Sequence, residues 1–352
     1  MFARLGALLC VMLLALPVTA QAAPVAPAPA VKWITEASAT LDHWYNPDDG
    51  RYRTTNWWNS ANALQAQLVA SSLLGNNLGP ERAANTYNQN IGNWFRNDYY
   101  DDEGWWGLAW VQAYDQTGQQ KYLVLAESLF TDMAHGWDLH CGGGIWWSKD
   151  RNYKNAIPNE LFLSLAAALS LRTDGPAAAN YKQWALLEWD WFSHTGMINA
   201  QGLVNDGLTQ DCKNNGRTTW TYNQGVVLGG LADLYRLTGR RDLLESATSL
   251  ANAAMTKLTD VNGVLHEPCE AQHCDVDQTQ FKGIFVRNLV ALNEVAPSTA
   301  YTAFAVRNAL AVWKSRNQAN QLGLFWSGPF DEADASRQSS ALDCLNAALQ
   351  LS

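Results

Sequence analysis

Apolar residues recur along most of the chain at the three- and four-residue spacing of amphipathic helices. No stretch alternates apolar and polar residues for long enough to predict a sheet, and Gly, Pro and Asn punctuate the segments between the periodic runs. The pattern therefore predicts an all-α protein. The expected helices span residues 32–44, 57–75, 80–95, 104–117, 120–137, 156–172, 177–193, 220–237, 240–257, 277–295, 298–316 and 336–351.

Two of the predicted helical pairs share a sequence motif. Residues 114–118 and 235–239 both read Tyr-x-x-Thr-Gly, and each motif is followed at the same spacing by an apolar pair and an Ala. Gly118 and Gly239 stand where a helix ends in the left-handed conformation, and the next helix begins almost at once, so the two helices must run antiparallel. Six such hairpins predict an (α/α)6 barrel, a six-hairpin toroid with inner helices ringed by outer ones and a cleft formed by loops at one end. The alternative is an open helical solenoid.

Composition narrows the class of partner. Of 352 residues, 47% are hydrophobic, which is enough for a large core, and no Pro- or Ser-rich linker interrupts residues 32–352. The formal net charge of −9 and the lack of a basic stripe argue against nucleic acid as a partner. Charged residues make up only 16%, whereas there are 17 Trp, a combination that suits a neutral polymer such as a polysaccharide. About half of these tryptophans are expected in the core.

The N-terminus has the pattern of a targeting segment. Arg4 precedes an apolar run over residues 5–16, and Ala20-Gln21-Ala22 fits a small-x-small cleavage site. The run is too short to span a bilayer. We therefore expect a signal peptide over residues 1–22, an Ala/Pro-rich tether over residues 23–31 and one domain over residues 32–352. The mature protein is expected to be a secreted or periplasmic monomer with no membrane segment.

Cleavage would leave five cysteines, an odd number, so at least one is expected to be unpaired. Cys269 and Cys274 lie five residues apart in a Pro-containing loop and can close a small disulfide ring. With His266 and His273 they also form a possible zinc cluster, but the spacing matches no standard zinc pattern and export favours the disulfide. No metal or other cofactor is expected.

The stretch NDYYDDEGWWG, residues 97–107, combines four acidic residues with two tryptophans. Asp101 and Asp102 are adjacent, and at the frayed start of a helix, expected near Gly104, both can tilt into one cavity. The alternative is structural: Asp98, Asp101, Asp102 and Glu103 would cap the helix and complement its dipole.

A pair of carboxyl groups is what glycoside hydrolysis requires. When the two groups lie about 5–5.5 Å apart, one acts as nucleophile and the other as acid/base, and the anomeric configuration is retained. Adjacent residues reach that separation more easily than the longer inverting one. Two carboxylates so close should not both ionise easily, so one pKa should rise, as a general acid near neutral pH requires.

Six stretches together resemble glycoside hydrolase family 76, the endo-α-1,6-mannanases. The first is YYDDEGWWGLAWVQAYDQTG, residues 99–118; the others are WWNSAN at 57–62, CGGGIWW at 141–147, KNAIPNEL at 154–161, WTYNQG at 220–225 and FKGIFVR at 281–287. The resemblance extends from about residue 35 to the C-terminus and is weaker over residues 211–217.

The resemblance implies an (α/α)6 barrel and retaining hydrolysis of α-1,6-linked mannan or manno-oligosaccharide. By analogy with the family, Asp101 is the nucleophile and Asp102 the acid/base. Three other functions stay open: a mannan transglycosidase acting on cell-wall glycan, a non-catalytic mannan-binding protein and, more remotely, a zinc-dependent (α/α)-barrel cyclase.

The remaining candidate residues would bind the glycan. Tryptophans offer flat apolar faces to mannose, and within each adjacent pair we expect one ring in the core and the other in the cleft; the candidates are Trp57, Trp58, Trp105, Trp106, Trp146, Trp147 and Trp326. Amide side chains can donate to and accept from sugar hydroxyls or can tie loops to helix ends, and these are Asn59, Asn62, Asn223 and Gln224. Tyr100, Glu103, Tyr222 and Asp206 complete the set, although Asp206 can instead form an Asx-turn. The CGGG run is expected to be a tight turn beside the cleft.

Two basic residues of the FKGIFVR stretch allow two interpretations. Lys282 and Arg287 either orient the acidic site or pair structurally with Glu270, and the structural pairing is favoured.

Overall fold

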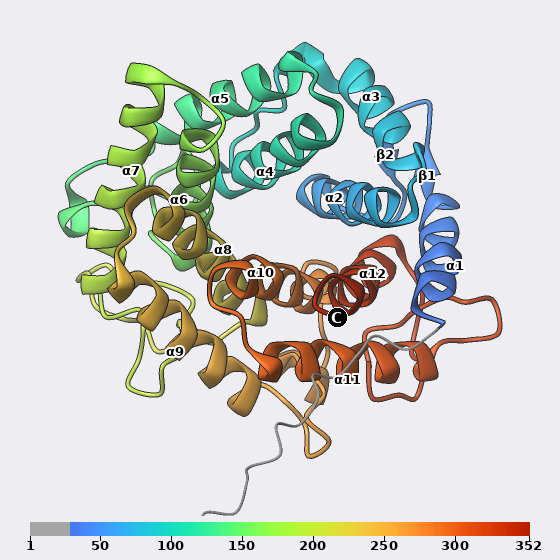
Figure 1. The fold of residues 1–352 in the computed structure, drawn as a ribbon. Helices are drawn as coiled ribbons and strands as arrows, with labels where there is room; N and C mark the ends of the chain where they lie inside the picture. The colour runs from blue at the N-terminus through green and yellow to red at the C-terminus, as the bar shows by residue number, and fades with distance from the viewer. Residues whose placement is uncertain (1–28) are drawn as a thin grey trace, which may run out of the picture.

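The structure, a computed structural model, describes residues 29–352 and consists of two concentric rings of helices (Figure 1). The outer helices are α1 (Ala30–Asp42), α3 (Leu78–Asn90), α5 (Gln120–Ala134), α7 (Gly175–His194), α9 (Arg241–Lys257) and α11 (Thr299–Ser315). The inner helices are α2 (Trp57–Leu74), α4 (Tyr100–Thr117), α6 (Ala156–Ser170), α8 (Thr221–Thr238), α10 (Phe281–Val295) and α12 (Ala335–Gln350). The short elements are β1 (Tyr45–Asn46), β2 (Arg51–Tyr52), and the 3-10 helices η1 (Ile91–Asn93), η2 (His140–Gly142), η3 (Pro268–Ala271) and η4 (Gln278–Gln280).

The inner ring is closed. Each inner helix packs against the inner helices on both sides, and α12 packs against α2. The predicted (α/α)6 barrel is therefore confirmed and the open solenoid is excluded. The predicted signal peptide and most of the predicted tether lie outside the described residues, but α1 begins at Ala30, so Ala30 and Val31 belong to a helix rather than to the predicted tether. No described helix is both long and apolar enough to cross a bilayer.

Glycines allow the inner helices to approach one another closely. A Cβ atom at Gly225 of α8 would lie 2.5 Å from the Cα atom of Phe285 on α10, and one at Gly283 of α10 would lie 2.4 Å from the carbonyl oxygen of Ser340 on α12. Any larger residue would force these helices apart, because backbone atoms cannot move aside as a flexible side chain can. The composition of the inner helices thus sets the diameter of the ring.

The connections differ between the two ends of the barrel. Where an inner helix ends, a short turn leads to the next outer helix; Gly118 (φ 64°) and Gly239 (φ 69°) end α4 and α8 in the left-handed conformation, as predicted. Where an outer helix ends, a longer loop leads back to the next inner helix, and the longest of these span residues 135–155, 195–220 and 258–280. All the inner helices therefore begin beneath long loops at one end, the position at which a cleft was expected.

Polar side chains in the first turns of the inner helices fasten these loops. Asn159 accepts from the backbone N–H of Ile145 at 2.7 Å and donates to its carbonyl at 3.0 Å. In the same way Gln224 accepts from the backbone N–H of Val204 at 2.7 Å and donates to its carbonyl at 2.9 Å. Ile145 and Val204 each belong to an isolated antiparallel bridge, so the same fastening recurs in two of the loops.

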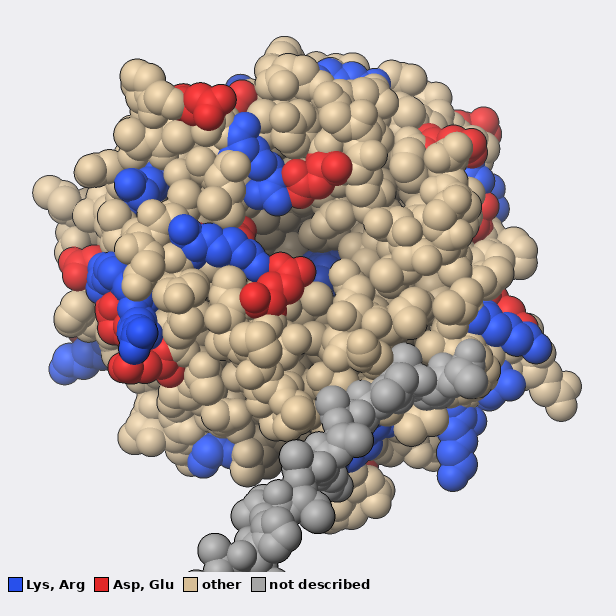
Figure 2. Space-filling model, in the orientation of Figure 1, with Lys and Arg blue, Asp and Glu red and all other residues tan. Residues whose placement is uncertain are grey.

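The opposite end of the barrel contains a cavity of about 280 Å³. Figure 2 shows neighbouring acidic and basic side chains around the hollow at this end. Arg172 pairs with Asp115 at 2.5 Å, and Arg236 pairs with both Asp233 and Glu294 at 2.5 Å. The pair of Arg172 with Asp115 joins the end of α6 to α4, and the pair of Arg236 with Glu294 joins α8 to α10, whereas Asp233 lies on α8 with Arg236. The lining of the cavity includes Trp105.

Candidate active site

The acidic stretch forms the first turn of α4. The helix begins at Tyr100, four residues before the expected start at Gly104, so Asp101, Asp102 and Glu103 are all helical. Residues 98–100 run antiparallel to the loop at 147–149: the N–H of Tyr100 donates to the carbonyl of Trp147 at 2.9 Å, and the N–H of Lys149 donates to that of Asp98 at 2.9 Å. This pairing brings the side chain of Trp147 over the start of α4.

Each aspartate of the pair has one hydrogen-bond donor. Trp147 donates its indole N–H to Oδ2 of Asp101 at 3.0 Å, and Asn97 donates its amide N–H to Oδ2 of Asp102 at 2.5 Å. The other oxygen of Asp101, Oδ1, is buried without a hydrogen-bond partner among the described residues. A carboxylate fixed through one oxygen keeps the other available to react.

Burial raises the pKa of both carboxyl groups. The pKa of Asp102 rises to about 7, mainly because of desolvation and also because of the charge of Asp277, while the hydrogen bond from Asn97 opposes the rise. Desolvation and then the charge of Asp102 raise the pKa of Asp101 well above its ordinary range, against the opposing effect of the Trp147 N–H. Two adjacent carboxyl groups with raised pKa values can share one proton, which suits the combination of an acid and a nucleophile.

The pair lies where two lobes of one cleft meet. An inner lobe of about 240 Å³ extends toward α8 and α10, and an outer lobe of about 400 Å³ extends along the start of α2. Four residues line both lobes: Trp58, Asp101, Trp147 and Asp277. Asp102 lines the outer lobe. A polymer could therefore extend to both sides of the pair.

Aromatic rings form a continuous surface in the inner lobe. Trp58 stacks on Trp105 with centroids 5.4 Å apart, Trp105 stacks on Tyr222 at 6.3 Å, and Tyr222 stacks on Phe281 at 3.8 Å. The rings come from α2, α4, α8 and α10, so the closed ring of helices assembles them. Such a surface suits the C–H faces of sugar rings.

The structure brings many of the predicted residues to the cleft. Those that line it are Trp57, Trp58, Asp101, Asp102, Trp105, Trp147, Asp206 and Tyr222. Asp206 accepts a hydrogen bond from the Tyr153 hydroxyl at 2.5 Å. The expected division of each tryptophan pair holds for Trp105 and Trp106 and for Trp146 and Trp147, but both Trp57 and Trp58 line the cleft.

Three predicted tryptophans lie elsewhere. Trp106 is fully buried between Trp57 and Trp110. Trp326 is buried beneath the ammonium group of Lys282. Trp146 turns away from the cleft, stacks on His140 and donates to Asp138 at 2.7 Å. The prediction that these three rings face the glycan is corrected, because their apolar surface is used in packing.

The predicted amides are also buried in the barrel. Gln224 fastens Val204, which is the alternative role considered for it, and Asn62 accepts from Arg287 at 2.6 Å. Asn59 and Asn223 are fully buried, and neither lines the cleft.

Two predicted residues next to the aspartate pair, Tyr100 and Glu103, also have a structural role. The ring of Tyr100 is buried against Gly136. Glu103 is buried, accepts from Lys149 at 3.0 Å and has its pKa raised by burial to about 8. No sequence pattern predicted that their side chains turn away from the pair.

Sequence reasoning missed several cleft residues. Tyr99 and Asn97 line the outer lobe, whereas Tyr153, Asn155, Trp220 and Asp277 line the inner one. Trp220 and Asn155 lie within the WTYNQG and KNAIPNEL stretches, which was a usable signal. Asp277 lies outside every recognised stretch.

The two basic residues of FKGIFVR pair structurally. Lys282 pairs with Glu270 at 2.5 Å, as favoured, but Arg287 pairs with Asp343 at 2.9 Å rather than with Glu270. Neither residue lines the cleft.

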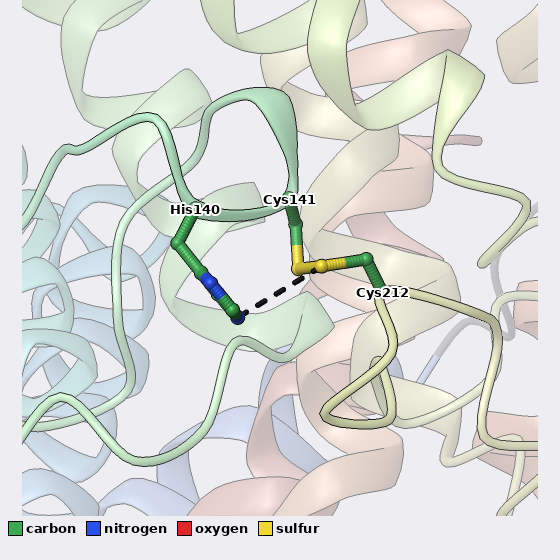
Figure 3. Close-up of side chains that lie close together, drawn as sticks. All are labelled: His140, Cys141 and Cys212. Atoms are coloured by element: carbon green, nitrogen blue, oxygen red, sulfur yellow. Dashed lines mark hydrogen bonds between the residues drawn. A yellow bond between two sulfur atoms is a disulfide. The ribbon is translucent and has the colours of Figure 1, made fainter.

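A disulfide joins two of the long loops beside the cleft. Cys141 is bonded to Cys212 across 71 residues of sequence, and His140 lies 3.8 Å from the sulfur of Cys212 (Figure 3). Both half-cystines have left-handed backbones, with φ 59°. These two cysteines and His140 are the only cluster of possible metal ligands found among residues 29–352, but the disulfide occupies both sulfurs.

The predicted disulfide between Cys269 and Cys274 is confirmed, which removes these sulfurs from the possible zinc cluster, and Cys344 is free and buried.

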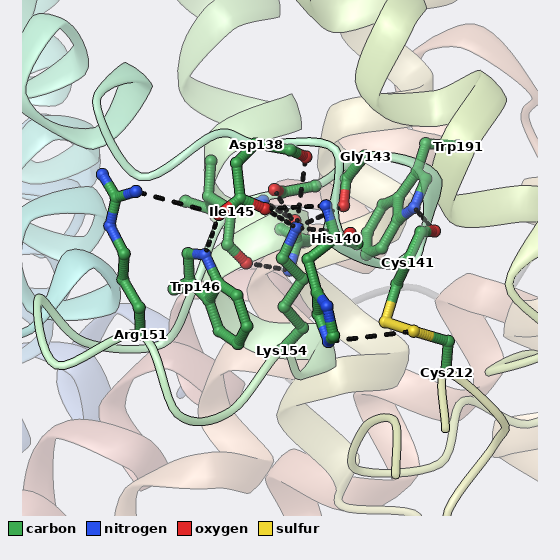
Figure 4. A network of polar contacts seen from close by, with 12 residues as sticks. Asp138, His140, Cys141, Gly143, Ile145, Trp146, Arg151, Lys154, Trp191 and Cys212 are labelled. Carbon is green, nitrogen blue, oxygen red and sulfur yellow. Dashed lines mark hydrogen bonds and ion pairs between the residues drawn. A yellow bond between two sulfur atoms is a disulfide. The ribbon is translucent and has the colours of Figure 1, made fainter. Parts of the chain in front are cut away.

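Lys154 organises the glycine-rich turn that follows Cys141. Its buried ammonium group donates to Oδ1 of Asp138 at 2.8 Å and to the carbonyls of His140, Gly143 and Gly144 at 2.7, 2.6 and 2.9 Å (Figure 4). Gly143 and Gly144 lie against the ring of Trp191, which leaves no room for a Cβ atom at either position. The CGGG run is therefore a turn that the buried ammonium group of Lys154 stabilises. The same loop places Trp147 next to Asp101.

The comparisons with known proteins agree with this geometry. The sequence profile described as glycosyl hydrolase family 76 matches residues 30–352. The chain belongs to glycosyl hydrolase family 76.

Family 76 relatives of this chain include two named yeast proteins. The mannan endo-1,6-alpha-mannosidase DFG5 of Saccharomyces cerevisiae is 30% identical over 265 residues, which are 70% of this chain and 56% of that protein. The mannan endo-1,6-alpha-mannosidase DCW1 of Candida glabrata is 31% identical over 249 residues, or 64% of this chain and 55% of that protein. The chain thus matches a little over half the length of these relatives.

Solved family 76 structures share the fold. The α-1,6-mannanase GH76A of Salegentibacter sp. HEL1_6 superposes with a TM-score of 0.82 at 24% identity, covering 92% of this chain and 100% of that chain. An inactive variant of GH76A, in which two adjacent aspartates are replaced by asparagine, is in complex with α-1,6-mannotriose; it superposes with a TM-score of 0.81 at 23% identity over the same shares.

Proposed function

We propose that this family 76 protein is an exported, monomeric endo-α-1,6-mannanase that hydrolyses α-1,6-linked mannan with retention of configuration. The observation that carries the proposal is the position of Asp101 and Asp102, adjacent in the first turn of α4 and at the junction of two cleft lobes. A site between two open lobes suits cleavage within a chain. The curated relatives named above as mannan endo-1,6-alpha-mannosidases support the choice of linkage and sugar.

In the proposed reaction Asp101 attacks the anomeric carbon while Asp102 protonates the departing glycosidic oxygen. A glycosyl ester forms on Asp101, and Asp102, now ionised, removes a proton from the water that hydrolyses the ester. The donor N–H of Trp147 supports this assignment, because it stabilises the ionised form of Asp101 and leaves Oδ1 free to attack. A pKa near 7 suits Asp102 as an acid that must later act as a base.

Other features support export. The expected signal peptide lies outside the described residues, but two disulfides are typical of a protein in an oxidising compartment.

The test is to incubate the protein, expressed without residues 1–22, with linear α-1,6-mannan and to follow the products by NMR. Short manno-oligosaccharides that are α-configured when first formed are expected, and Asp101→Asn and Asp102→Asn should each abolish them. Asp98→Asn is the matched control, because Asp98 lies in the same acidic stretch but lines neither lobe. Full activity in both catalytic variants would overturn the proposal, and longer chains among the products would favour the transglycosidase.

Adding azide as an external nucleophile distinguishes the proposed nucleophile from the proposed acid/base. With Asp102→Ala, azide should intercept the glycosyl ester and give an α-mannosyl azide. With Asp101→Ala it should replace the nucleophile directly and give the β-anomer. The reverse pattern would exchange the assignments.

A further inference from the structure

Asp277 is a carboxylate with one fixed and one unused oxygen in the cleft. Its Oδ1 accepts the indole N–H of Trp58 at 2.8 Å and the amide N–H of Asn56 at 2.9 Å. Its Oδ2 makes no hydrogen bond within residues 29–352, and the side chain lines both lobes. Because the fixed oxygen sets the direction of the free one, Oδ2 is directed to accept from a ligand in the cleft.

The segment that carries Asp277 is held in place. Oδ1 of Asp275 accepts the backbone N–H groups of Asp277 and Gln278, both at 3.0 Å. The disulfide between Cys269 and Cys274 closes the chain just before this turn. The position of the carboxylate is thus fixed from its own loop and from the start of α2.

The cleft is acidic and has no counter-charge of its own. Five aspartates line the two lobes, namely Asp101, Asp102, Asp206, Asp275 and Asp277, and no described Lys, Arg or His lines either lobe. Two nearby cations pair outside the cleft lining, Lys149 with Glu103 and Lys282 with Glu270, and Arg217 lies 5.9 Å from the ring centroid of Tyr153. An anionic group that entered the cleft would meet unpaired negative charge in a partly desolvated space, where repulsion is stronger than in water.

We propose that Asp277 binds the glycan through Oδ2 and makes the cleft select uncharged glycans over anionic ones, such as phosphorylated or sulfated mannan. The inference rests on the proposed function of the cleft and adds a substrate class to it. The reaction itself needs two carboxyl groups, so the charge of Asp277 is available for selection. A sugar hydroxyl can donate to Oδ2, whereas a sulfate ester or a fully ionised phosphate ester has no proton to donate there and adds repulsion.

The experiment compares two derivatives of one linear α-1,6-mannan, substituted at equal low density with acetyl or with sulfate groups. The wild-type kcat/KM is expected to be at least ten-fold lower on the sulfated polymer, with a gap that narrows at 0.5 M salt because salt screens the repulsion. Asp277→Asn preserves the shape and the acceptor for Trp58 and Asn56 but removes the charge, so it should narrow the gap several-fold at constant salt. Asp190→Asn is the control for net charge, since Asp190 is exposed on α7, far from the cleft lining.

Binding of substituted oligosaccharides to Asp102→Asn, measured by calorimetry, separates the two ways to fail. Equal affinity for acetylated and sulfated α-1,6-mannotetraose overturns the inference and leaves the proposed function intact. Failure to bind or cleave any neutral α-1,6-mannan overturns the proposed function. If the difference in kcat/KM between acetylated and sulfated mannan is the same in Asp277→Asn as in the wild type, other residues make the selection and the role of Asp277 is overturned.

Discussion

The indole N–H of Trp147 lies 3.0 Å from Oδ2 of Asp101, so a residue of the long loop before α6 lowers the pKa of a carboxylate on α4, against the effect of burial. The bond stabilises the ionised aspartate, the form that a nucleophile requires. Trp147 also belongs to the loop that Lys154 and the disulfide at Cys141 hold in place. The chemistry of the pair therefore depends on how that loop is folded.

Removing this hydrogen bond should weaken the nucleophile. In Trp147→Phe the pKa of Asp101 should rise further, the shared proton should move toward Asp101, and kcat/KM should fall about 10- to 100-fold, the size expected for a lost hydrogen bond to a charged group. The acid limb of the pH profile should move to higher pH, because Asp101 ionises later. Trp146→Phe is the control, since Trp146 bonds Asp138 instead; an equal shift in both variants would contradict the prediction.

The neighbours of Asp102 should move its titration in opposite directions. Asn97 lowers the pKa of Asp102 and Asp277 raises it. In Asn97→Ala the pKa should therefore rise above about 7 and the alkaline limb of kcat/KM should move to higher pH. In Asp277→Asn the same limb should move to lower pH. Shifts of the same sign in the two variants would contradict the opposite effects of Asn97 and Asp277, and no shift in either would show that burial alone sets this pKa.

Gln224 should affect stability more than sugar binding. The side chain is fully buried and makes three hydrogen bonds, two to Val204 and one to the carbonyl of Trp220. Gln224→Ala would leave buried backbone groups unpaired, and we expect a loss of about 2–4 kcal/mol in the free energy of unfolding. Chemical denaturation checks this against Gln318→Ala, an exposed amide. A stable variant with weakened mannan binding would restore the role in sugar recognition that the sequence suggested.

The two disulfides should differ in their contribution to stability. In the chain-entropy account the stabilisation grows with the length of the closed loop, which gives about 4 kcal/mol for the 71-residue separation of Cys141 and Cys212 and about 2 kcal/mol for the five-residue separation of Cys269 and Cys274. Paired Cys→Ser variants compared in urea should show this order. Loss of the first should also raise KM, because it joins the loops that carry Trp147 and Asp206. Equal destabilisation by the two would refute the entropic order.

Most of the fold could be predicted because it depends on local signals. The apolar period gave the twelve helices to within a few residues, and the left-handed glycines at 118 and 239 gave the antiparallel hairpins. The start of α4 was misplaced because three acidic residues in a row have the pattern of a loop, although a helix N-terminus stabilises them. The disulfide between Cys141 and Cys212 depends on loops that meet only in the folded barrel, so no local pattern could pair them.

The site was predicted at the level of residue types more than of individual side chains. The acidic pair and the tryptophan stretches were recognisable, but which ring of a pair faces the cleft depends on helix rotation, and Trp146 and Trp147 differ in just this respect. The buried amides were misassigned because Asn and Gln use the same amide atoms to hydrogen-bond loop backbones and sugar hydroxyls. Asp277 had no neighbouring motif and was revealed only by its contacts with Trp58 and Asn56.

Trp105 lines both the proposed catalytic cleft and the cavity at the other end of the barrel. It is the one described residue that lines both spaces, so its indole ring lies between them. A small residue at position 105 would open a continuous passage and let water approach the glycosyl ester from behind. Since water and a sugar acceptor compete for that ester, the identity of one buried side chain would help decide whether a mannan chain is shortened or transferred.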